Sequence, residues 1–79
     1  MQAHRHKFMI NQKFGIVVAN LRKSKGLSQE ELAFELGLHR TYISQIERGI
    51  KSPSLRVIET ISSFFEVQLS GLFKLVENE

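Results

Sequence analysis

Residues 28–49 read SQEELAFELGLHRTYISQIERG, and this stretch decides the fold. Ser28 is followed three residues later by Glu31, a spacing that predicts a capping box at the start of a helix. Three apolar residues share one face of that helix, namely Leu32, Ala33 and Leu36. Gly37 then predicts a reversal of the chain, because a left-handed backbone is easiest without a Cβ atom.

A second short helix is predicted from Arg40 to Arg48, with Ile43 and Ile46 facing the core. Its opposite face is polar and basic, formed by Arg40, Thr41, Ser44, Gln45 and Arg48. Two short helices joined by a tight turn are typical of a DNA-binding helix-turn-helix, in which the second helix enters the major groove. Arginine reads guanine, glutamine reads adenine, and threonine contacts the thymine methyl group. We therefore expect four residues to read bases, namely Arg40, Thr41, Ser44 and Gln45. The alternative is that they form an ordinary solvated helix face.

The same stretch resembles the helix-turn-helix of the phage repressor and Cro family, also called the xenobiotic-response-element family. The matching residues are Leu21, Arg22, Gly26, Leu27, Ser28, Gln29, Leu32, Ala33, Gly37, Ile43, Ser44, Ile46, Glu47, Gly49, Pro53 and Leu55. They keep the order and spacing of the family without a gap, and the likeness covers about residues 12 to 69. The run RTYISQIERG, in a chain of 79 residues, also resembles the controller proteins of restriction-modification systems.

This resemblance implies an all-α, five-helix DNA-binding domain of the lambda-repressor type that spans residues 1–79. It also implies that Glu47 pairs with Arg22 on the first helix and so clamps the second helix of the motif in place. No partner acid, nucleophile or metal cluster accompanies Glu47, and we therefore prefer this structural role to a catalytic one.

Four residues are expected to hold DNA phosphates, namely Gln29, Tyr42, Arg48 and Lys51. Gln29 begins the first helix of the motif, where free backbone N–H groups attract phosphate, and its position in the family contacts the DNA backbone. Tyr42 either packs at the edge of the domain or donates to a phosphate. His39 takes the cap position of the second helix, where the family has a small residue. Histidine is a weaker cap, which leaves a contact with DNA as an alternative.

The charges are divided along the chain. Residues 1–25 carry six basic side chains and no acidic one, residues 39–56 a net charge of +3, and residues 57–79 a net charge of −3. The positive segments favour a nucleic-acid partner, because phosphate neutralisation supplies much of the affinity. Glu30 and Glu31 lie early in the first motif helix, where they stabilise the helix dipole. In family members that activate transcription, acidic residues on this helix contact RNA polymerase.

Composition indicates a small cytoplasmic domain of a bacterium or phage. The chain has no cysteine, which excludes a disulfide and a thiolate metal site. No apolar run approaches the roughly 18 residues of a membrane span, and residues 1–10 lack the apolar region of a secretory signal. His4 and His6, two residues apart in the arm, are poor evidence for a metal site, and His39 lies far along the sequence, so we expect no metal and no cofactor.

The chain divides into an arm and five helices, with no strand pattern. The arm covers residues 1–9, where Arg5 and Lys7 either lie along DNA or belong to a disordered tail. The helix-turn-helix occupies residues 28–48, and Pro53 suits the first turn of the helix after it. The remaining three helices are expected at residues 11–24, 54–65 and 71–76.

Residues 57–76 carry more apolar side chains than one core face needs. A chain of this size builds only a small core, and an exposed apolar patch usually marks an interface. Related stand-alone members of the family form dimers. The alternative is that all these side chains fill the monomer core. We expect a homodimer through Phe64, Val67, Leu69, Leu72 and Phe73.

The sequence therefore predicts a homodimeric transcription regulator that binds a palindromic operator and controls a restriction-modification operon. Alternatives in the same class are a phage-type repressor and a toxin-linked antitoxin. A different class is a protein-interaction module with the same fold and no sequence-specific DNA binding, which the basic face of the second motif helix disfavours. An enzyme has no support, because no nucleophile–base set or phosphate-cradling glycine loop is present.

Overall fold

Five helices and no strand form the described part of the chain, in a computed structural model that gives the backbone of residues 2–79 and the side chains of residues 9–79. The helices are α1 (Gln2–Ser24), α2 (Gln29–Leu36), α3 (Arg40–Glu47), α4 (Leu55–Phe64) and α5 (Leu69–Glu77). This architecture confirms the all-α, five-helix fold predicted from the sequence. No described helix is long and apolar enough to cross a membrane.

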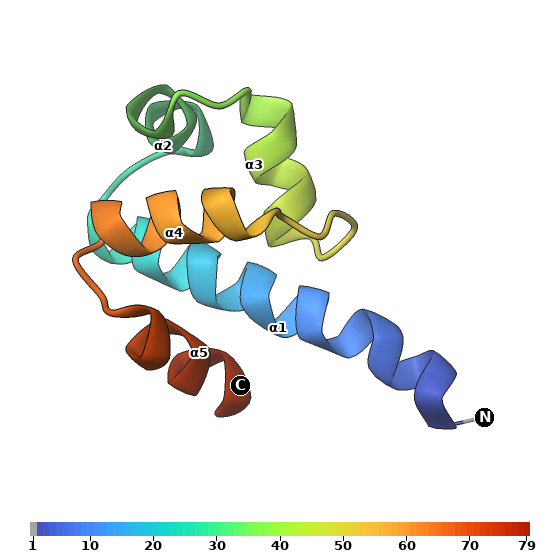
Figure 1. Ribbon diagram of the computed structural model, residues 1–79. Helices are drawn as coiled ribbons and strands as arrows, with labels where there is room; N and C mark the ends of the chain where they lie inside the picture. The colour runs from blue at the N-terminus through green and yellow to red at the C-terminus, as the bar shows by residue number, and fades with distance from the viewer. Residues whose placement is uncertain (1) are drawn as a thin grey trace.

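The long helix α1 runs through the middle of the molecule, with α2 and α3 on one side and α5 on the other (Figure 1). Every helix, or the residue that caps it, contributes to one apolar core. The buried side chains of that core are Phe14, Val17, Val18, Leu32, Ala33, Ile43, Ile46, Ile61, Phe65, Leu72 and Val76. Because each helix buries one face in the same cluster, the position of each helix depends on the others.

Helix α1 begins at Gln2, so residues 2–9 of the predicted arm form its first turns. This corrects the predicted start at residue 11. The segment contains no glycine or proline that would stop a helix already held by the core further along. The predicted roles of Arg5 and Lys7 fall outside the described side chains.

Two boundaries near α4 and α5 also differ from the prediction. Pro53 lies before Ser54, the N-cap residue of α4, and so precedes the first helical turn. Helix α5 begins at Leu69 rather than after Ser70, with Gln68 as an N-cap residue that makes no side-chain cap hydrogen bond.

The helix-turn-helix is built as the sequence predicts. Ser28 Oγ accepts a hydrogen bond from Glu31 N at 3.0 Å, and Glu31 Oε1 accepts one from Ser28 N at 2.8 Å, which completes the capping box. Gly37 has a φ of 69°, in the left-handed region, and the amide of Leu38 donates to the Ala33 carbonyl oxygen at 2.8 Å. His39 is the N-cap residue of α3 and makes no side-chain cap hydrogen bond.

Helix α3 packs against α1 almost backbone to backbone. A Cβ atom on Gly15 would lie 2.4 Å from the carbonyl oxygen of Ile46 and 2.5 Å from that of Glu47. Gly49, which follows α3, has a φ of 76°, and a Cβ there would lie 2.8 Å from Gln12 Cα. The two glycines therefore set how closely the end of α3 approaches α1.

Replacing Gly15 with alanine should destabilise the fold, because the new methyl group overlaps carbonyl oxygens that are fixed in α3. We expect the free energy of unfolding to fall by about 1–3 kcal/mol, as measured by urea denaturation at equal protein concentration. Gly71→Ala is the matched control, since its Cβ would meet only a Val67 methyl carbon at 3.3 Å and alanine favours a helix. Equal midpoints for Gly15→Ala and the parent would contradict the close packing of α1 and α3.

Candidate nucleic-acid interface

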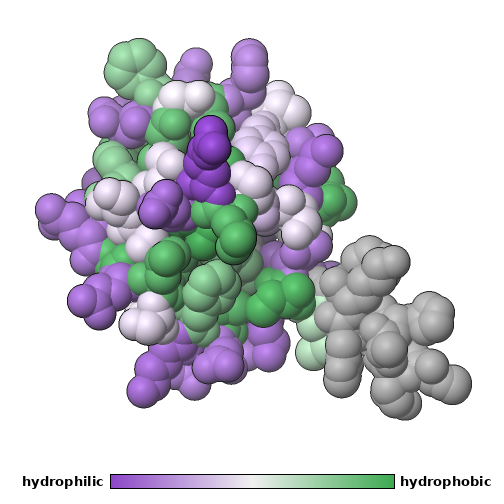
Figure 2. Space-filling view, viewed as in Figure 1, coloured by the Kyte–Doolittle hydropathy of each residue, from purple (hydrophilic) through white to green (hydrophobic). Residues whose placement is uncertain are grey.

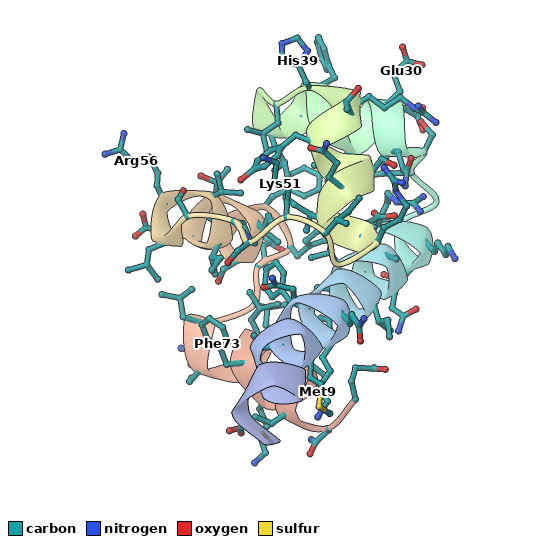
Figure 3. The ribbon with its side chains drawn as sticks, turned by 90° about the vertical axis from the view of Figure 1, so that its right-hand side faces the viewer. Met9, Glu30, His39, Lys51, Arg56 and Phe73 are labelled. Atoms are coloured by element: carbon teal, nitrogen blue, oxygen red, sulfur yellow. The ribbon has the colours of Figure 1, made fainter. Side chains whose placement is uncertain are left out.

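Helix α3 presents one apolar and one polar face. Ile43 and Ile46 are buried in the core, which turns the opposite face outward. Of the residues predicted to read bases, Arg40 and Thr41 are exposed, and Ser44 and Gln45 are half-buried. Figure 3 views this side of the molecule, with His39 at one end of α3 and Lys51 in the loop that follows it. The four predicted base-reading residues thus share one outward face of a single helix.

The residues predicted to hold phosphates surround this polar face. Arg48 caps the C-terminal end of α3 and is exposed, with Nε at 3.4 Å from the Ser44 carbonyl oxygen. Lys51 is exposed in the next loop, whereas Tyr42 is half-buried and packs against the core. Together with Arg40, three cations therefore border the face, a pattern that suits phosphate contacts around base contacts.

The predicted ion pair joins α1 to the end of α3. Arg22 Nε donates to Glu47 Oε2 at 2.7 Å, and a second guanidinium nitrogen donates to Glu47 Oε1 at 3.0 Å. The third nitrogen donates to the Leu27 carbonyl oxygen at 2.8 Å. Only 11% and 6% of the two side chains are exposed. The hydrogen bond to Glu47 raises the pKa of Arg22, against the opposing effect of its burial, so the guanidinium stays charged.

Gln29 belongs to the same cluster. Its Nε2 donates to Glu47 Oε1 at 2.9 Å, which connects the start of α2 to the end of α3. The sequence placed Gln29 at a phosphate and did not identify this bond, because the two residues lie far apart in the chain. Among the described residues, every buried side-chain nitrogen and oxygen has a hydrogen-bond partner.

The predicted dimer residues divide into three environments. Leu72 is fully buried in the monomer core, so its assignment to a dimer interface is wrong, because it cannot reach a partner. Phe64 and Val67 are half-buried and pack against the core; the Phe64 ring lies edge-on to Phe65 at 5.0 Å. The remaining two residues, Leu69 and Phe73, are exposed.

A groove of ≈ 230 Å³ lies between α4 and α5. It is lined by Leu55, Arg56, Ile58, Glu59, Leu69 and Phe73. Leu55 is 80% exposed, Leu69 44% and Phe73 37%, and Figure 2 shows apolar side chains gathered over this part of the surface. Leu55 and Ile58, which also line the groove, are not among the residues that the sequence predicted for the dimer interface.

The described residues offer no cluster of metal ligands. Among residues 9–79, no three histidine, cysteine, aspartate or glutamate side chains come together. His39 is exposed at the start of α3. His4 and His6 lie outside the described side chains, so the absence of a metal there stays a prediction.

Comparison with known proteins identifies the family. The family model HTH_3, described as helix-turn-helix, matches residues 18–72. The control protein C.BamHI of Bacillus amyloliquefaciens is 57% identical over 60 residues, which cover 75% of this chain and 74% of that protein. The chain belongs to the helix-turn-helix family of controller proteins. The family resemblance predicted from the sequence is therefore confirmed.

Solved structures of the controller family share this fold. The restriction-modification controller C.AhdI from Aeromonas hydrophila has a TM-score of 0.74 and 41% identity, covering 80% of this chain and 96% of that chain. The controller C.Esp1396I, solved as a tetramer in complex with its natural 35-base-pair operator, has a TM-score of 0.76 and 33% identity, covering 87% of this chain and 91% of that chain.

Breaking the ion pair should unfold the domain at a lower temperature. Removing one partner of a mostly buried pair strands the other, at a cost of roughly 3–5 kcal/mol. Glu47→Ala and Arg22→Ala should therefore each lower the melting temperature strongly, and their losses should not add in a double-mutant cycle. Arg48→Ala removes an exposed arginine next to Glu47 and should melt close to the parent. Parent-like melting of both single variants would refute the structural role of the pair.

Proposed function

We propose that this chain is a transcription regulator that binds a palindromic operator as a homodimer and controls a restriction-modification operon. The observation that carries the proposal is the polar, basic face of α3. Burial of Ile43 and Ile46, together with the pair between Arg22 and Glu47, holds this face at the surface. A helix exposed in this way fits the major groove of B-DNA.

The base-reading side chains on α3 have complementary chemistry. Arg40 offers two parallel donors, which suit guanine, and Gln45 offers a donor and an acceptor, which suit adenine. Thr41 offers a methyl group and a hydroxyl, and Ser44 offers a hydroxyl. This face therefore distinguishes base pairs in the major groove.

Phosphate contacts position the helix. Arg48 and Lys51 supply charge at the end of α3 and in the following loop, and the Tyr42 hydroxyl supplies a donor. Gln29 contributes from the start of α2, where it is also bonded to Glu47. The same glutamine thus links a phosphate contact to the orientation of α3.

The dimer forms through the groove between α4 and α5. Leu55, Leu69 and Phe73 present apolar surface there, and Arg56 and Glu59 add opposite charges at the edge. A two-fold axis brings the same patch of both subunits together. Two copies of α3 then read two half-sites, which raises the specificity of so short a helix.

The controller role is proposed from the relatives, because C.BamHI and C.AhdI are controller proteins. The C.Esp1396I controller, solved as a tetramer in complex with its natural operator, supports operator binding by more than one subunit. A regulator of this kind acts on DNA in the cytoplasm, needs no cofactor and is not an enzyme. Glu30 and Glu31 on α2 form a contact with RNA polymerase when the protein activates transcription.

Selection from random DNA should return a palindrome whose half-sites lie about 34 Å apart or a multiple of that distance.

Arg40→Ala and Gln45→Ala should each weaken binding to that site by roughly 1–3 kcal/mol, measured by fluorescence anisotropy, and relax the preference at one base pair per half-site. Binding to random DNA should fall much less. Lys74→Ala removes a charge on α5 and serves as the control. If a variant loses equal affinity for operator and random DNA, the substituted residue contacts phosphates rather than bases. If the parent binds any DNA without preference, the chain is better explained as a protein-interaction module.

Substituting Phe73 with aspartate should give a folded monomer, because the charge repels the apolar patch of the partner twice in a symmetric dimer. Light scattering should show half the parent mass, and operator binding should weaken while half-site binding persists. Leu55→Asp, at a more exposed position of the same groove, should also give a folded monomer with weaker operator binding. Ile16→Asp, an exposed apolar residue of α1 outside the groove, should remain a dimer. A parent that stays monomeric at tens of micromolar would contradict the dimer.

A further inference from the structure

Arg56 and Glu59 are two exposed charged residues of α4 that line the groove between α4 and α5. Figure 3 shows Arg56 extending away from the body of the protein, on the same side as Phe73. Among the described residues, the one ion pair joins Arg22 to Glu47. Neither charge at the groove therefore has an ion-pair partner within the described part of its own chain.

The surface on the other side of Glu59 does not supply a cation either. There Glu59 lines a groove of ≈ 460 Å³ between α2 and α4, together with Glu35, Leu36, Thr60, Ser63 and Phe64. Of the described residues that line this groove, two are carboxylates and none is basic, and like charges repel. A favourable charge partner for Glu59 must therefore come from another molecule.

The spacing of the two charges on α4 is self-complementary. Positions 56 and 59 are separated by roughly 4.5 Å along the helix axis, and the basic residue lies nearer the N-terminus. In a two-fold dimer, a contact of one residue with another is always repeated with the two subunits exchanged. A two-fold axis that passes between these positions thus sets Arg56 opposite Glu59 of the partner subunit, and does so twice.

The apolar part of the groove does not select a partner by itself. Leu55, Leu69 and Phe73 are exposed there, but apolar attraction has no direction. Charges at the edge of an interface fix its register, because opposite charges attract and like charges brought together are costly. Proteins commonly reject wrong partners through such a repulsive element.

We propose that Arg56 and Glu59 form two reciprocal ion pairs across the two-fold axis and so select a second copy of this chain as the occupant of the groove. A chain of the same fold with like charges at both positions would face either Arg56 or Glu59 with the wrong sign and is rejected. The inference rests on the dimer of the proposed function. It adds to that dimer the choice of partner and the register of the two α4 helices.

The test reverses each charge alone and measures the mass of the full chain by light scattering without DNA. Arg56→Glu and Glu59→Lys should each raise the dissociation constant of the dimer by about tenfold or more, because two attractive pairs become two repulsive ones. The monomers should stay folded by circular dichroism. Both residues are exposed, and an acidic residue in the first turn of α4 favours the helix dipole.

Mixing the two variants is the decisive step. The Arg56→Glu chain carries two acidic groups at the groove and the Glu59→Lys chain two basic groups, so the mixture should form a heterodimer of the parent mass. The double variant Arg56→Glu/Glu59→Lys exchanges the two charges and should regain most of the affinity of the parent. Lys23→Glu, the same charge reversal on α1 outside the groove, should remain a dimer.

Salt provides an independent readout. Raising the ionic strength from about 0.1 M to about 1 M shortens the screening length from about 10 Å to about 3 Å, which should weaken the parent dimer and strengthen dimerisation of each single variant. If the parent is a dimer and the mixture stays monomeric, the proposal is overturned, as it is if both single variants dimerise like the parent. A monomeric parent instead refutes the proposed dimer, and with it this choice of partner.

Discussion

The docking of α3 against α1 is the constraint on which the rest of the structure depends. Gly15 allows the two backbones to approach, and Glu47 is held by Arg22 from α1 and by Gln29 from α2. Since a helix of eight residues does not hold its shape alone in water, the orientation of the α3 surface comes from this docking. The cluster also explains why Glu47, although charged and beside the polar face, serves the scaffold rather than the ligand.

Basic and acidic side chains lie on different parts of this scaffold. The cations Arg40, Arg48 and Lys51 border the outward face of α3. The charged side chains of α2 are all carboxylates, and residues 57–79 have a net negative charge. A positive face beside a negative one orients the molecule on DNA, because only the former gains from phosphate neutralisation. The groove between α4 and α5 is lined by no residue of α2 or α3, which leaves it free for a second subunit.

Features set by neighbouring residues could be predicted from the sequence. The capping box at Ser28 and the reversal at Gly37 need only residues within one turn, and the pair of Arg22 with Glu47 followed from the family resemblance. Gly15 could not be predicted, because its reason is the carbonyl oxygens of a helix far along the chain. Leu72 was misplaced for a related cause: the inward face of α5 depends on how that helix packs against α1, which periodicity does not determine.

The most direct test of the account is to titrate the nitrogen-15-labelled protein with its selected operator and follow the backbone amide shifts by NMR. The account predicts that the largest shifts occur at Gln29, along α3 and in the loop that contains Lys51. The amides of α5 should shift little, because the proposed dimer places that helix at the second subunit and away from DNA. Large shifts confined to α5, or equal shifts throughout the chain with operator and random DNA, would contradict the assignment of α3 as the reading helix.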